Sequence, residues 1–84
     1  METKKLMVLV EAGAVREAEA LPDGDGWAVW VTYASRRGER HEVLERQRGG
    51  ARVFVTLDAV ARCLAAVGLS GFAVNLGQGE ESSS

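Results

Sequence analysis

Six of the ten lysine and arginine residues lie between residues 36 and 52, where their side chains could bind a partner. Arginine can hold phosphates or read guanine edges, so this cluster could form a DNA-contacting sheet face. Glu39, Glu42 and Glu45 are interleaved with it and favour a solvated hairpin with cross-strand arginine–glutamate pairs. We favour the hairpin, because the whole chain has a net charge of −2. The candidate nucleic-acid or partner contacts are Arg36, Arg37, Arg40, Arg46, Arg48 and Arg52.

The other residue types that could do chemistry form no motif. His41 and Cys63 are the single histidine and the single cysteine, and they stand far apart in the sequence. Their spacing therefore matches neither a metal-binding motif nor a nucleophile–base motif. Asp23 and Asp25 alternate with glycine as in a tight turn, without the further acidic positions of a calcium loop. We expect no catalytic residue, no metal and no cofactor, and hence no enzyme.

Residues 56–67 carry the start, period and stop signals of a helix together. Thr56 can cap the N-terminus of the helix, and Asp58 places a negative charge in the first turn, where the helix dipole favours it. Gly68 can adopt the left-handed conformation that ends a helix. Apolar side chains recur at three- and four-residue steps and form one stripe. This pattern predicts a helix that packs on the core, with a stripe made of Leu57, Val60, Ala61, Leu64 and Val67.

The rest of the chain predicts an α+β fold: an antiparallel sheet of about five strands with the helix (about 56–67) on one face. Residues 14–21 have a helical composition, yet the turn residues at 22–26 lead directly into the best strand, so we predict a hairpin. The candidate strands are 6–10, 14–21, 27–33, 41–46, 51–55 and 72–76. A single small domain covers residues 1–76, and residues 77–84 form a polar tail that we expect to be disordered.

The strand predicted over residues 27–33 divides its side chains between the two sheet faces. Alternate residues from Trp27 to Tyr33 point toward the helix, while Trp30 points to the uncovered face. An exposed apolar patch of that kind is typical of an interface, and a symmetric homodimer would bury it. The N-terminal segment or the tail of the same monomer could cover Trp30 instead. The candidate dimer interface is Met7, Leu9, Ala28 and Trp30.

The longest apolar run, residues 6–10, is far shorter than a membrane span or the core of a signal peptide. A single cysteine also fits an inert thiol in a reducing compartment. We therefore expect a cytoplasmic protein with no membrane contact.

Over almost its whole length to residue 76, the chain resembles the plasmid-encoded proteins called ParC-type partition-associated proteins. The resemblance rests on structural glycines and apolar positions: residues 10–16, Gly26 and Trp27, Gln47 and Arg48, Phe54, the Thr56-Leu57-Asp58 helix start, Val67 to Leu69, and Phe72. It implies a bacterial mobile-element protein encoded near a partition ATPase and its centromere-binding partner. It brings no functional residues to carry over.

Residues 27–67 are also similar to the three-stranded, one-helix DNA-binding domains of some phage integrases and of plant AP2-type factors. Those domains bind DNA through the sheet face away from the helix. This chain departs from them in being acidic and in having an extra candidate strand at residues 6–10.

From these observations we predict a small non-enzymatic binding or assembly module, an accessory of plasmid or mobile-element maintenance that acts through protein contacts. A homodimer is the expected assembly, with plasmid partition proteins as possible partners. The alternative is a small DNA-binding domain that uses the arginine-rich region 36–52.

Overall fold

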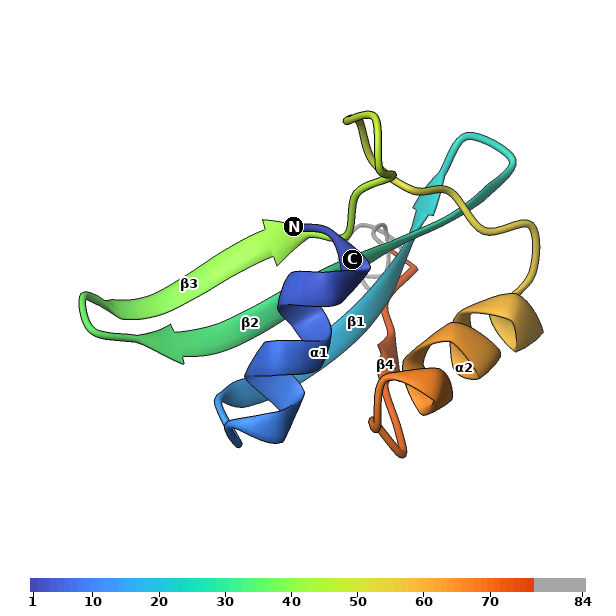
Figure 1. Ribbon diagram of the computed structural model, residues 1–84. Helices are drawn as coiled ribbons and strands as arrows, with labels where there is room; N and C mark the ends of the chain where they lie inside the picture. Colours follow the sequence, from blue (N-terminus) through green and yellow to red (C-terminus); the bar gives the residue numbers. More distant parts are fainter. Residues whose placement is uncertain (77–84) are drawn as a thin grey trace, which may run out of the picture.

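The computed structural model describes residues 1–76, and the predicted polar tail 77–84 lies outside the described residues. Within this part, two helices and four strands follow the order α1 (Thr3–Glu11), β1 (Val15–Asp23), β2 (Gly26–Ser35), β3 (Gly38–Val43), α2 (Leu57–Ala66) and β4 (Ala73–Val74) (Figure 1). The strands form one sheet in the order β3-β2-β1-β4, in which β4 runs parallel to β1 and the other pairs are antiparallel. The α+β class is confirmed, but the expected all-antiparallel sheet of about five strands with one helix is corrected to a mixed four-stranded sheet with two helices.

Strands β1, β2 and β3 form an antiparallel meander, which confirms the predicted hairpin at residues 14–33. Ala18 pairs with Val31 and Ala20 pairs with Val29, so these four side chains lie on one face of the sheet. All four are buried, and both valines are inaccessible to solvent. The short alanine side chains on β1 leave room for the helices that pack on this face.

Helix α2 begins and ends where the local signals predict. The Thr56 hydroxyl accepts a hydrogen bond from the Ala59 N–H at 3.1 Å. At the other end, the N–H groups of Gly68 and Leu69 donate to the carbonyls of Ala65 and Leu64, the paired bonds of a Schellman stop. The predicted core-facing stripe is confirmed at Val60, Leu64 and Val67, which are buried, whereas Ala61 is exposed and does not belong to it.

The segment 6–10 is helical rather than a strand, which corrects the sequence prediction. Leu6 is fully buried, and Leu9 and Val10 pack against the core, at the spacing of one face of a helix. Met7 and Val8 are exposed between them. An unbroken apolar run fits a strand and a helix equally well, so the space left on the sheet beside α2 decides the outcome.

Residues 51–55 do not form a full strand, which is a second correction. Strand β3 already pairs with β2 up to Trp30, and the Leu44 N–H then donates to the Val29 carbonyl at 2.8 Å. Only the start of β2 remains free, and Phe54 pairs there with Trp27 through two bonds of 2.8 Å. The residues between Leu44 and Phe54 therefore leave the sheet edge as a loop.

Both helices cover the same face of the sheet. Leu6 of α1 and Leu64 of α2 belong to one buried cluster with Val29 and Val31. The two helices also meet, since a Cβ atom at Gly68, just after α2, would lie 3.1 Å from the Val10 side chain. The opposite face carries neither helix. Strand β4 confirms that residues 72–76 return to the sheet, although only two residues pair there.

Candidate functional site

The histidine and the cysteine cannot act together, because they lie on opposite sides of the sheet. His41 pairs with Thr32 on the open face, while Cys63 packs against the core from α2. Among residues 1–76, no group of three or more acidic, histidine or cysteine side chains is placed to hold a metal ion. Neither helix in this part of the chain is long and apolar enough to cross a membrane.

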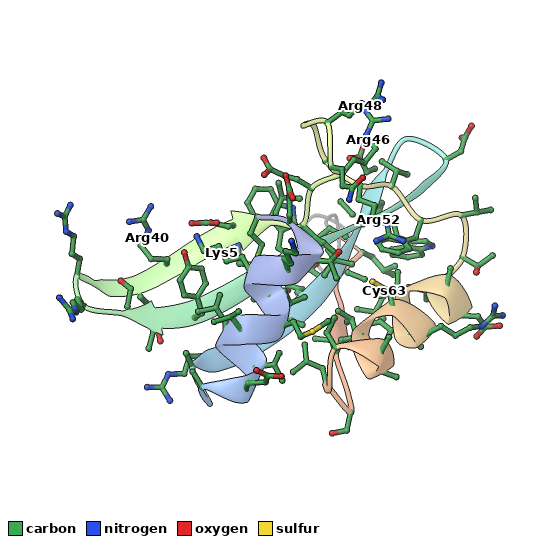
Figure 2. All side chains as sticks on the ribbon, viewed as in Figure 1. Lys5, Arg40, Arg46, Arg48, Arg52 and Cys63 are labelled. Carbon is green, nitrogen blue, oxygen red and sulfur yellow. The ribbon has the colours of Figure 1, made fainter. Side chains whose placement is uncertain are left out.

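The six candidate arginines do not form one surface. Arg36 and Arg37 occupy the turn between β2 and β3, whereas Arg46 and Arg48 lie in the loop after β3. The six residues of β3 separate the two groups, and a strand of that length spans roughly 20 Å. Arg40 lies between them and is paired with Glu42 at 3.9 Å. The arginine-rich region thus divides into a turn group, Arg36 and Arg37, and a loop group, Arg46, Arg48 and Arg52. Figure 2 shows the loop group well apart from Arg40 on β3.

Trp30 is the centre of the open sheet face, as the alternation predicts. Its ring stacks on the His41 ring, with 4.8 Å between the centroids and 13° between the planes. The His41 Nδ1 atom is also 3.0 Å from the Thr32 hydroxyl, which holds the imidazole in place. Ala28 is buried on this face, only 4% exposed, and Leu21 beside it is half-buried. The face therefore presents the half-buried Trp30 ring stacked on His41, with Glu19 of β1 paired opposite Trp30 and Ala28 buried beside it.

Met7 and Leu9 do not join Trp30, which corrects that half of the predicted interface. Both residues belong to α1, and α1 packs on the other face of the sheet. Leu9 contributes to the core, and Met7 is 40% exposed beside the loop that follows β3. Because the prediction placed residues 6–10 in a strand, it assigned their side chains to the wrong face.

A network that the sequence did not indicate ties α1 to β3. The Tyr33 hydroxyl donates to Glu42 Oε2 at 2.7 Å, and Lys5 Nζ lies 3.4 Å from Glu42 Oε1. The Tyr33 hydrogen bond and, after it, the charge of Lys5 lower the pKa of Glu42 below its usual value, against an opposing effect of burial. The Met1 amino group donates to the Val43 carbonyl at 2.7 Å and pairs with Glu45 at 3.1 Å. These contacts fix the start of α1 against the edge of the sheet.

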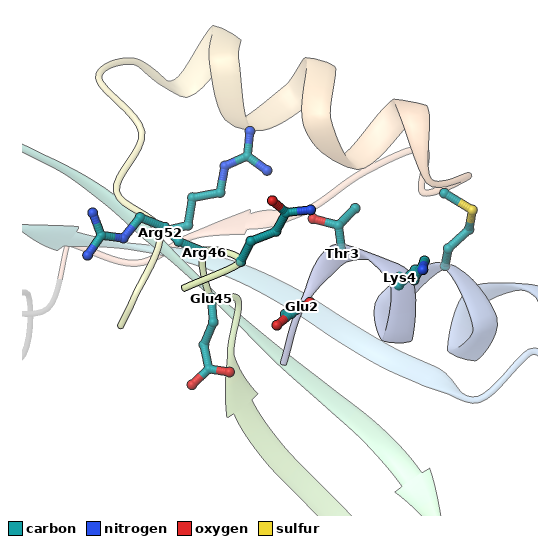
Figure 3. A pocket seen from close by; sticks show the side chains of 8 residues that line it. Glu2, Thr3, Lys4, Glu45, Arg46 and Arg52 are labelled. Atoms are coloured by element: carbon teal, nitrogen blue, oxygen red, sulfur yellow. The ribbon is translucent and has the colours of Figure 1, made fainter. Parts of the chain in front are cut away.

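A hollow of about 470 Å³ lies between the start of α1 and the loop after β3 (Figure 3). Three cationic side chains line it, Lys4 from the helix and Arg46 and Arg52 from the loop, together with Glu2 and Glu45. Sequence reasoning missed this site, because Lys4 is distant in sequence from the arginines. The helical spacing of Leu6, Leu9 and Val10 is the signal that could have placed α1 beside the loop.

A family model described as ParC-like matches residues 1–79, nearly the whole chain. No curated protein and no solved structure matches the chain. The match confirms the resemblance to ParC-type small proteins that the glycines and apolar positions predicted.

Proposed function

The chain belongs to the ParC-like family, and we propose that it is a non-enzymatic binding module that serves plasmid or mobile-element maintenance through protein contacts. We further propose that it acts as a homodimer. The observation that carries this proposal is the open sheet face, where Trp30 stacks on His41 while both helices cover the other side. A partition ATPase encoded beside the gene would support the plasmid role.

A second copy is the occupant that best fits this face. A chain of this length buries only about 60–65% of its extended surface, so a partner that covers apolar side chains adds needed stability. Removing apolar surface from water stabilises the assembly by roughly 25 cal/mol per Å². Trp30 is the large side chain that a dimer would cover first.

The charges on the open face are also compatible with a two-fold axis. Glu17 on β1 and His41 on β3 both lie opposite Thr32 of β2, on either side of it. An axis parallel to β2 that passes over Trp30 would set β1 of one copy over β3 of the other. Glu17 of each copy would then face His41 of its partner, where a carboxylate can accept a hydrogen bond from an imidazole N–H.

Light scattering at micromolar concentration tests the dimer, with Trp30→Glu as the disrupting variant. We expect the unmodified protein to be a dimer and Trp30→Glu to be a monomer, because two carboxylates would meet near the axis. Val8→Glu is the matched control, since Val8 is 63% exposed on α1, away from the open face. A monomeric unmodified protein, or a Trp30→Glu variant that stays fully dimeric, would show that this face is not the interface.

DNA binding through the arginine-rich region remains the alternative prediction, and the geometry does not favour it. Phosphate contacts gain strength from many cations that follow one backbone. The turn group and the loop group lie at opposite ends of β3, so neither extends the other.

A further inference from the structure

We propose that the cationic hollow between α1 and the loop after β3 binds an acidic segment of a protein partner that also carries an apolar side chain. The proposal rests on the proposed role in protein contacts, but not on the dimer. The hollow is lined by the start of α1, on the side of the sheet that carries the helices, whereas the dimer uses the open face.

The positive charge of the hollow is not neutralised within the described chain. Among residues 1–76, no carboxylate pairs with Lys4, Arg46 or Arg52. Of the two carboxylates that line the hollow, Glu45 is engaged by the Met1 amino group at 3.1 Å. Glu2 alone remains to offset three cations, so the hollow attracts anions although the chain as a whole is acidic.

The loop backbone and the Arg52 side chain are held in place before any ligand arrives. The loop closes on itself through the Arg46 N–H, which donates to the Gly50 carbonyl at 3.0 Å, and through the pairing of Glu45 with Ala51. The Arg52 guanidinium lies over the Phe54 ring, 4.7 Å from its centroid. Arg46 folds over the turn, since a Cβ atom at Gly50 would lie 3.3 Å from its Nη2 atom. The Arg52 guanidinium, fixed in this way, loses little freedom on binding a carboxylate.

The lining of the hollow favours a peptide over a nucleic acid. Arg46 and Arg52 can each hold a carboxylate through two parallel N–H bonds. Met7 adds an exposed apolar surface that an aliphatic side chain of a peptide can cover. A nucleic-acid phosphate backbone carries no such side chain. A segment that alternates acidic and aliphatic residues satisfies both kinds of surface.

Fluorescence anisotropy with a labelled short peptide of alternating glutamate and leucine tests the proposal, starting at an ionic strength of about 0.1 M. We expect the affinity for the peptide to fall as salt is added. The Arg46→Gln/Arg52→Gln variant should bind the peptide roughly tenfold or more weakly, a loss of about 1.4 kcal/mol or more, because it removes two of the three cations of the hollow. The matched control is Arg36→Gln/Arg37→Gln, which removes the same charge from the turn group. The control should change the affinity by less than about twofold, because those charges lie roughly 20 Å away along β3, about twice the Debye length of about 10 Å at 0.1 M.

Three results would overturn the proposal: no binding of the peptide, an equal loss in the control variant, or tighter binding of a short DNA duplex at the same hollow. Arg46→Gln alone is the second variant, because it leaves the stacking of Arg52 on Phe54 intact, and it too should weaken binding. Circular dichroism confirms the folding of each variant. Light scattering of the double variant should show an unchanged oligomeric state, which separates failure of the hollow from failure of the dimer.

Discussion

Replacing Leu6 by alanine tests the helical assignment of α1 and its role in the core. The substitution removes about three methylene equivalents, worth roughly 2.4 kcal/mol at ~0.8 kcal/mol each. Leu6 is fully buried, so an unfilled cavity adds to this cost, and we expect about 3 kcal/mol in total. A chain of 84 residues has a stability of roughly 4–13 kcal/mol at about 0.05–0.15 kcal/mol per residue. The loss is therefore a large fraction of the whole.

Val8→Ala is the comparison that makes this experiment decisive. In a strand, Leu6 and Val8 would share one face and both substitutions would be costly. In the observed helix Val8 is 63% exposed, so its truncation loses only about 0.6 kcal/mol, and the better helix propensity of alanine offsets most of that. Urea unfolding followed by tryptophan fluorescence, at two protein concentrations, should show a midpoint lowered by about 2 M for Leu6→Ala if the slope is ~1.5 kcal/mol/M. Equal shifts for the two variants would refute the helix.

Two further predictions concern the sheet. A Cβ atom at Gly26 would overlap the Phe54 carbonyl, so Gly26→Ala should cost about 1–3 kcal/mol in urea unfolding; a cost no larger than that of Gly71→Ala, where the space is open, would contradict this contact. Because the pKa of Glu42 is lowered, its stabilising effect is present above the usual glutamate value of about 4.5 and is lost as the pH falls through the folded-state value. Tyr33→Phe should therefore destabilise the protein at neutral pH and do so less in acid, and an equal loss at both would contradict the Tyr33–Glu42 hydrogen bond.

Local signals in the sequence were sufficient wherever one segment determined its own structure. Thr56, the apolar stripe and Gly68 define α2 without reference to the rest of the chain, and their bonds form as predicted. The same holds for the turn at residues 22–26, which joins two adjacent segments into a hairpin. In each case, the residues that decide the structure are neighbours in the sequence.

The predictions failed where distant segments compete for the same place. Residues 51–55 have strand composition, but β3 already occupies most of the β2 edge, so Phe54 alone pairs there. The apolar run at residues 6–10 fits both the period of a helix and that of a strand. It forms a helix because a helix covers the part of the sheet surface that α2 leaves uncovered. The arginines that cluster in the sequence are separated by the length of β3, while Lys4 and Arg46 line one hollow only after α1 has docked. No local pattern contains this information.

The two proposed surfaces lie on different sides of the sheet, and this arrangement has a consequence for binding. A dimer through Trp30 would bury both open faces and leave one cationic hollow exposed on each copy. A partner with two acidic segments could then engage both hollows, and the second contact would be intramolecular. With a linker that spans the two sites, the effective concentration for that contact is about millimolar, and avidity can exceed the affinity of one contact by roughly 10²–10⁴. A hollow that binds a single peptide weakly would thus suffice for a stable complex, provided that the dimer holds.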